Sequence, residues 1–140
     1  MDPVVDHIHP EVYEVLSFTP IDEPLLKHVF IGKRFRPIEF FGRKVLLPLP
    51  DVLLATKIKS VLQRDKEHKR IKDIADIYVL SWYSDENIAT LKAALAAILP
   101  PQEIRTIIES FTREDLNAVS NILGTEILQV QRVLRELKSR

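Results

Sequence analysis

The sequence predicts an α+β fold in which a small N-terminal strand and hairpin region precedes a predominantly helical bundle. Seven of the nine prolines and two of the three glycines lie in the first 50 residues. Proline interrupts both helices and strand ladders, so we expect short elements joined by turns there. Residues 51–99 and 102–140 contain no proline and carry apolar residues at helical spacing. We therefore expect an α/β portion over residues 1–48 and a helical bundle over residues 49–140, together in one compact domain.

The first 48 residues are predicted to form short strands and one short helix. Val4–Ile8 has the composition of a strand, and Pro10–Phe18 that of a helix with proline near its start. His28–Ile38 alternates in character, which predicts a second strand. The segments Ile38–Phe41 and Lys44–Leu47 flank a glycine and are expected to form a hairpin.

Six helices are expected to follow. A proline pair ends the third and opens the fourth, since proline fits the first turn of a helix but not its interior. Asp85, Thr112 and Thr125 are the predicted N-terminal caps. Gly124 is the predicted stop between the last two helices. The expected helices span residues 51–63, 69–83, 86–99, 102–111, 113–123 and 126–139.

Composition excludes several classes of function. The chain has no cysteine, which excludes disulfide scaffolds, thiolate nucleophiles and cysteine-ligated metal centres. Its three glycines are too scattered to form a glycine-rich loop around a phosphate. Lysine and arginine total 20 against 20 acidic residues, and a net charge of zero argues against a general polyanion binder. The sequence shows no targeting or membrane-spanning pattern, so we expect a cytoplasmic protein without a membrane partner.

The balanced charge is unevenly distributed. Residues 1–24 hold six acidic residues and no lysine or arginine, whereas residues 27–44 hold six basic residues and one acid, Glu39. These segments either pack together, face a charged ligand or form two solvated faces. The hairpin from Lys33 to Lys44 also interleaves bases with phenylalanines, which suits single-stranded nucleic acid or the end of a tRNA. In the alternative, which we favour, the phenylalanines lie in the core and the bases in solvent.

Two cations and two carboxylates are predicted to converge between the first two helices of the bundle. Lys57 and Arg64 are seven residues apart and share one helix face, and Asp73 and Asp76 are three apart and share a face of the next helix. The short connection makes these helices neighbours. In one interpretation Arg64 pairs with an aspartate and pins the helices, while Lys57 is a surface residue. In the other, both cations bind nucleotide phosphates and the aspartates orient them.

The residues around this cluster resemble a known family. Three stretches carry the resemblance: Leu49-Pro50-Asp51-x-Leu53-Leu54-x-x-Lys57, then Arg64, then Lys72-Asp73-x-x-Asp76-Ile77-Tyr78-x-Leu80. In this order they look like the C-terminal conserved region of the AbiEii/AbiGii-type nucleotidyltransferases, minimal nucleotidyltransferases that include toxins of toxin–antitoxin systems. The resemblance implies strands before the cluster, a helical bundle after it and nucleotide contact at the cluster.

The catalytic elements of that family are absent from this sequence. Nucleotide transfer there needs a Gly-Ser or Gly-Gly turn and an Asp-x-Asp pair, which hold the phosphates and a divalent metal, and neither pattern occurs here. The resemblance matches Asp6 to the family's third carboxylate. Mg²⁺ and a nucleoside triphosphate are therefore expected only where the rest of the active site is supplied elsewhere. His7 and His9 are two residues apart and would lie on one face of a strand. The sequence offers no clear third ligand beside them, so we predict no metal site.

We accordingly expect a nucleotidyltransferase-like protein, either the C-terminal half of such an enzyme or a catalytically incomplete homologue, with little or no independent catalysis. Asp6 is the candidate catalytic residue, Lys57 and Arg64 the candidate nucleotide-binding residues, and Asp73 and Asp76 the groups that orient them. The expected partners are a nucleotide and a protein, which would be the missing catalytic half, an antitoxin or a second copy. The alternative is a non-catalytic helical module that binds protein or RNA, with the cluster as a structural set of salt bridges.

Overall fold

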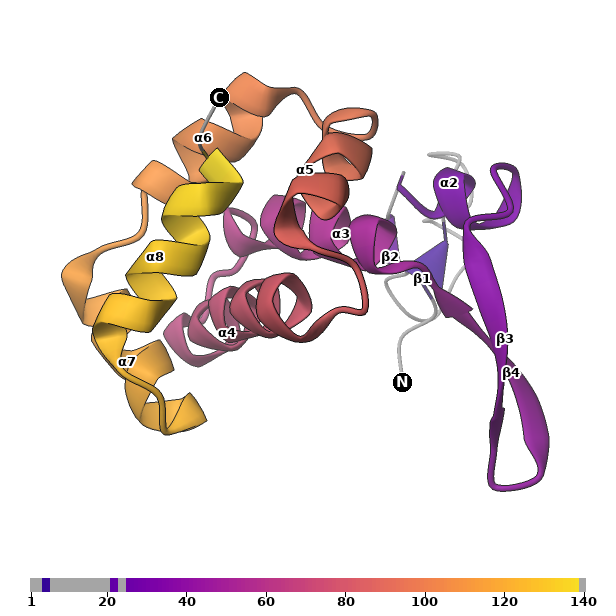
Figure 1. Ribbon diagram of the computed structural model, residues 1–140, viewed down its shortest axis with the longest axis horizontal. Helices are drawn as coiled ribbons and strands as arrows, with labels where there is room; N and C mark the ends of the chain where they lie inside the picture. The colour runs from indigo at the N-terminus through magenta and orange to yellow at the C-terminus, as the bar shows by residue number, and fades with distance from the viewer. Residues whose placement is uncertain (1–3, 6–20, 23–24, 139–140) are drawn as a thin grey trace, which may run out of the picture.

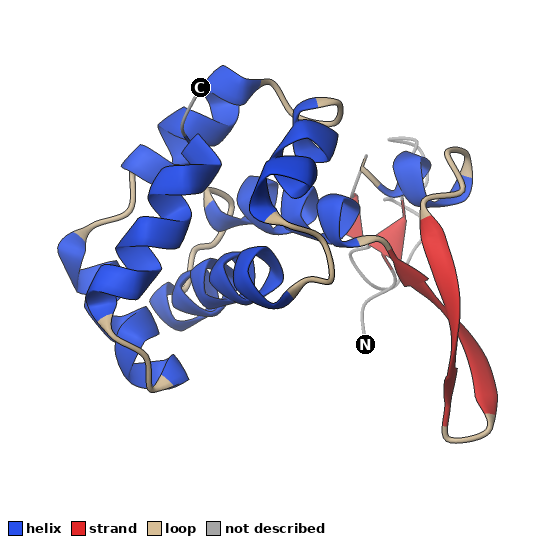
Figure 2. Ribbon diagram, viewed as in Figure 1, coloured by secondary structure: helices blue, strands red, loops and turns tan. Residues whose placement is uncertain are grey.

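The structure is a computed structural model of the 140-residue chain, and it describes residues 4–5, 21–22 and 25–138. The fold is α+β and mostly helical, as the sequence predicts. Figure 1 shows a bundle of helices with the strands at one end, and Figure 2 shows a two-stranded hairpin that projects away from the bundle. The described elements are β1 (Val4–Val5), β2 (Ile21–Asp22), α2 (Leu26–Phe30), β3 (Phe35–Phe40), β4 (Arg43–Pro48), α3 (Pro50–Val61), α4 (Glu67–Tyr83), α5 (Ile88–Ala96), α6 (Pro101–Glu109), α7 (Arg113–Leu123) and α8 (Ile127–Lys138).

The N-terminal elements agree with the prediction only in part, because β1 lies within the predicted strand Val4–Ile8. β1 and β2 form a short parallel pair, with Val4 opposite Ile21. The predicted helix Pro10–Phe18 and the rest of the first predicted strand lie outside the described residues. The predicted strand His28–Ile38 is wrong, because α2 occupies its first part and β3 begins only at Phe35.

The buried positions explain the helix at α2. Leu25 and Val29 are both buried and lie four residues apart, which is one face of a helical turn. Ile31, which the alternating pattern places with Val29, is 80% exposed. The alternation of apolar residues in this segment was therefore not the alternation of a half-buried strand.

The hairpin lies where the sequence predicts it, but two of its phenylalanines are exposed and not in the core. β3 and β4 pair antiparallel, and Phe40 lies opposite Arg43. The turn between them has positive φ at both Phe41 and Gly42, as two-residue hairpin turns require. Phe40 and Phe41 are exposed, so the favoured interpretation that places the hairpin phenylalanines in the core is wrong for these two residues. Only Phe35, at the base of the hairpin, is half-buried.

All six predicted helices of the bundle are present, with corrections at their ends. Thr112 caps α7 in a reciprocal capping box with Asp115, as expected of a threonine at that position. Gly124 ends α7 with a φ of 62°, where a residue without a Cβ is favoured. The predicted cap Asp85 is wrong, because the side chain of Asn87 caps α5. α8 begins at Ile127, two residues after Thr125, so Thr125 is not its cap residue.

The hydrophobic core lies between the helices of the bundle. Among the described residues, Leu25 and Val29 are the buried apolar residues that precede α3. α8 contributes the buried residues Val130, Val133, Leu134 and Leu137 and packs against α4, α6 and α7. None of the described helices is long and apolar enough to cross a lipid bilayer.

This distribution predicts that residues 49–140 fold without the strand region. We expect a fragment of these residues to retain helical circular dichroism and a cooperative urea transition, since nearly all of the core lies within it. Asp51 is buried and pairs with Arg34, which the fragment lacks, so Asp51→Asn is expected to raise the stability of the fragment. The same substitution in the full chain should lower it. A fragment that unfolds without a cooperative transition, with or without this substitution, would show that the bundle depends on the hairpin region.

Candidate functional site

The four cluster residues predicted from the sequence lie together between α3 and α4. The ammonium nitrogen of Lys57 lies 3.0 Å from Asp73 Oδ1 and 2.7 Å from Asp76 Oδ2. Nε of Arg64, just beyond the end of α3, lies 2.6 Å from Asp73 Oδ2. The i, i+3 spacing of the aspartates and the seven-residue spacing of the cations therefore do place these groups in contact. Lys57 is not an isolated surface residue, because it bridges both carboxylates.

Asp73 is the centre of this cluster. Its side chain is 2% exposed, and its two oxygens accept hydrogen bonds from Lys57, Arg64 and Ser60, whose hydroxyl donates over 2.9 Å. The side chains of Lys57 and Arg64 are 29% and 34% exposed, so a buried carboxylate supports two cations that reach the surface. Sequence reasoning missed Ser60, although it lies three residues after Lys57 on the same face of α3, which is the signal that would have found it.

The ion pairs shift three pKa values. Burial acts to raise the pKa of Asp73, but hydrogen bonds from Arg64, Lys57 and Ser60 outweigh it, so the pKa lies below its ordinary value. Burial acts to lower the pKa of Lys57, yet its hydrogen bonds to Asp76 and Asp73 leave the pKa raised. The hydrogen bond to Asp73 raises the pKa of Arg64. All three groups are therefore charged at neutral pH.

The cluster retains hydrogen-bond donors that face outward. A lysine ammonium has three N–H groups and an arginine guanidinium has five. Among the described residues, Lys57 contacts two carboxylates and the Nη atoms of Arg64 donate to no group. These cations therefore have donors to offer an anion while Asp73 holds them in place.

A small hollow begins at the cluster. It has a volume of about 210 Å³, and Lys57 and Asp76 form its polar side while Leu53, Val79 and Leu80 form its apolar side. The combination of a fixed cation with an apolar wall suits a ligand that has both an anionic and an apolar part.

The described residues contain no group of side chains that could hold a metal ion. No group of three histidine, aspartate or glutamate side chains comes together in the described part of the chain. The candidate catalytic residue Asp6 lies outside the described residues, as do His7 and His9. The role of Asp6 therefore stays a prediction.

Two further ion pairs, each with a buried aspartate, were missed by sequence reasoning. Arg34 pairs with Asp51, which is buried at the start of α3, and its backbone carbonyl accepts a 3.0 Å hydrogen bond from the N–H of Leu49. Arg70 of α4 pairs with the buried Asp115 of α7. Both pairs join residues far apart in sequence, and local spacing carries no signal for such contacts.

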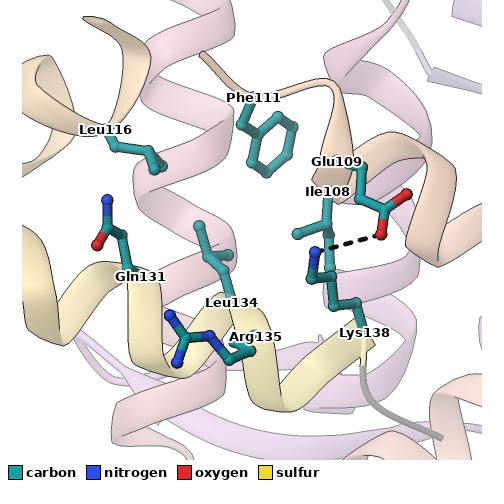
Figure 3. Close-up of a pocket in the computed structure, with 8 residues that line it drawn as sticks. All are labelled: Ile108, Glu109, Phe111, Leu116, Gln131, Leu134, Arg135 and Lys138. Atoms are coloured by element: carbon teal, nitrogen blue, oxygen red, sulfur yellow. Dashed lines mark hydrogen bonds and ion pairs between the residues drawn. The ribbon is translucent and has the colours of Figure 1, made fainter. Parts of the chain in front are cut away.

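A second hollow, larger than the one at the cluster, lies elsewhere. It has a volume of about 320 Å³ and opens between α6, α7 and α8, and Figure 3 shows Lys138 of α8 directed toward Glu109 of α6 across it. Their ion pair measures 3.2 Å. Gln131 and Arg135 supply the other polar groups, and none of the predicted site residues lines it. Size alone therefore does not locate the candidate site.

Comparisons with known proteins do not identify the chain. No protein-family model matches the sequence, and neither a search of curated proteins nor a search of solved structures finds a match.

Proposed function

We propose that this chain is a nucleotidyltransferase-like protein, the C-terminal half or a catalytically incomplete homologue of an AbiEii/AbiGii-type enzyme, that binds a nucleotide through Lys57 and Arg64. The observation that supports the proposal most is the arrangement of these two cations on the buried carboxylate of Asp73. Both cations are partly exposed and keep unused donors, which is the arrangement that a phosphate-binding pair needs.

The physical argument for a phosphate is preorganisation. An arginine fork donates to two phosphate oxygens at once, and a lysine adds a point charge. Long side chains normally lose rotamer freedom when they bind an anion. Asp73 removes that freedom before the ligand arrives, because it already fixes Lys57 Nζ and Arg64 Nε. The apolar side of the adjacent hollow then offers a surface for the base or sugar.

Catalysis would need groups that this chain lacks. Nucleotidyl transfer relies on metal ions held by clustered carboxylates. The sequence has no Asp-x-Asp pair, and the two aspartates that do lie together are already paired with Lys57 and Arg64. Mg²⁺ would therefore act in this proposal only where a partner supplies the remaining carboxylates. We expect no nucleotide transfer by this chain alone in the presence of Mg²⁺ and a nucleoside triphosphate.

Calorimetric titration with nucleoside triphosphates tests the proposal. We expect Lys57→Ala and Arg64→Ala each to weaken binding by about tenfold to a hundredfold, the value of a hydrogen bond to a charged group. Lys59→Ala is the matched control, because Lys59 is also on α3 and also forms an ion pair, 3.0 Å from Glu103. Equal losses in the Lys59 variant, or no heat for any nucleotide with the unmodified protein, would contradict the proposal.

The alternative function is a non-catalytic module that binds protein or RNA. It is favoured by the balance of charge in the cluster, because two cations and two carboxylates contact one another and form a closed structural set. In this case the substitutions at Lys57 and Arg64 would lower stability without changing the affinity for any nucleotide. The candidate protein partners are the missing catalytic half, an antitoxin or a second copy of the chain.

A further inference from the structure

The tip of the β3–β4 hairpin carries two exposed aromatic rings. Phe40 is 59% exposed and Phe41 is 91% exposed. Their ring centroids lie 4.5 Å apart in an edge-to-face arrangement, so the two rings form a small apolar surface at the end of the hairpin. Figure 2 shows this tip as the part of the hairpin farthest from the helices. The bundle therefore offers these rings no core in which to pack.

The backbone at Phe41 is also unusual. Its φ of 49° lies in the left-handed region, where glycine and asparagine are favoured and a bulky side chain is strained. Neither folding of the turn nor burial explains a phenylalanine here, because glycine suits the turn better and the ring is exposed. Strain at an exposed residue is most simply explained by a role of its side chain in binding.

Cations flank the aromatic rings. Arg43 lies opposite Phe40 on one face of the hairpin, and Lys44 lies opposite Glu39 on the other face. Among the described residues, neither Arg43 nor Lys44 forms an ion pair, and both are exposed. Arg36, on the same face of the hairpin as Phe40, pairs with the exposed Asp85 over 3.2 Å. The hairpin therefore presents aromatic rings among available positive charges.

We propose that the β3–β4 hairpin binds single-stranded nucleic acid. Unpaired bases stack on exposed aromatic rings, and lysine and arginine side chains contact the phosphates between them. Phe40 and Phe41 would supply the stacking surface, and Arg43 and Lys44 the phosphate contacts. A duplex does not fit this arrangement, because its bases are already stacked on one another.

The hairpin is less suited to protein binding by strand addition. Pro37 lies within β3 and Pro48 ends β4, and each lacks the N–H that an added strand would need. Exposed lysines and arginines also discourage pairing between two copies of the same positively charged hairpin. Charge and hydrogen-bonding capacity both favour the polyanion.

The surface next to the hairpin leads toward the cations of α3. A hollow of about 200 Å³ at the base of the hairpin is lined by Arg36 and by the exposed Tyr83. It shares Leu53, Val79 and Leu80 with the hollow beside Lys57. The two hollows are therefore adjacent. Binding at the hairpin does not depend on the nucleotide site, so the two proposals are tested separately.

Fluorescence anisotropy with labelled single-stranded oligonucleotides tests this proposal. Phe41→Gly removes the ring and suits the positive φ, so we expect binding to weaken by about tenfold while the melting temperature stays the same or rises. Arg43→Ala and Lys44→Ala should each reduce the dependence of log K on log salt by about 0.7, the single-strand value per phosphate contact. Leu128→Ala, which alters an exposed apolar residue of α8, is the control and should leave binding unchanged.

Three results would overturn the proposal. The first is no binding of single-stranded RNA or DNA by the unmodified protein. The second is an unchanged affinity in Phe41→Gly and in the double variant Phe40→Ala, Phe41→Gly. The third is a concentration-dependent self-association, seen by sedimentation, that these variants abolish while oligonucleotide binding is absent or unaffected. That third result would assign the hairpin to contact between two copies of the chain.

Discussion

Asp73→Asn is expected to lower the free energy of unfolding by about 2–3 kcal/mol. The substitution keeps the shape of the side chain but removes the buried charge that three donors share. Breaking a fully buried ion pair costs about 3–5 kcal/mol, because the remaining charge has no partner. The cost is smaller here because Lys57 and Arg64 are each about a third exposed, so that water hydrates them again. Urea denaturation monitored by circular dichroism measures the change.

Asp76→Asn is the matched control for this prediction. It removes a carboxylate from the same helix and the same lysine, but its side chain is 35% exposed. A partly exposed ion pair contributes about 1 kcal/mol or less. If both variants lose the same stability, the burial of Asp73 does not determine the strength of the cluster and the prediction fails.

The lowered pKa of Asp73 also predicts a dependence on pH. A carboxyl group whose pKa is lower in the folded than in the unfolded state stabilises the fold above the unfolded value, which is 3.8. This contribution is lost as the pH falls through the folded pKa. The difference in stability between the unmodified protein and Asp73→Asn should therefore be constant near neutral pH and narrow below about pH 4.

Asp115→Ala is expected to lower the free energy of unfolding by about 2–4 kcal/mol. Its buried carboxylate accepts hydrogen bonds from the backbone N–H of Thr112 and from Nη1 of Arg70. The substitution therefore breaks the capping box of α7 and the contact between α7 and α4 together. A lost cap costs about 1 kcal/mol, and Arg70, whose side chain is only 25% exposed, adds the rest because it is left without its partner.

Two further variants separate these contributions. Thr112→Ala removes only the hydroxyl that accepts from the N–H of Asp115, and should cost about 1 kcal/mol. Arg70→Met removes the cation but keeps an apolar stem, and combined with Asp115→Ala it completes a double-mutant cycle. A coupling energy near zero between Arg70 and Asp115 would mean that the ion pair contributes nothing to the joining of the two helices.

The sequence predicts the helices of the bundle well because the residues that indicate each helix lie within it or next to it. Apolar spacing and the absence of proline locate the helices, and Thr112, a favoured capping residue, locates the start of α7. The same logic places Lys57 beside Asp73 and Asp76, since two neighbouring helices bring residues of known spacing onto facing sides.

Contacts between distant segments are the part that local signals cannot supply. Nothing near Arg34 indicates that it reaches Asp51, and nothing near Arg70 indicates that it reaches Asp115. Phe41 was predicted to lie in the core but is exposed, for a related reason. Hydrophobicity places a phenylalanine in the core, but whether a core lies within reach depends on where the hairpin projects. The assignments of Lys57, Arg64 and Asp6 to a nucleotide site remain predictions.

The position of α8 has a consequence for how the protein folds during synthesis. α8 supplies buried residues that pack on α4, α6 and α7, so the groups that it covers stay exposed to water until it has been made. α3 and α4, which are consecutive, can pair as soon as both leave the ribosome. The core of the bundle therefore stays incomplete until α8 has been translated. Chains that stall before Ile127 should expose an apolar face, and these are the chains that chaperones and proteases would recognise first.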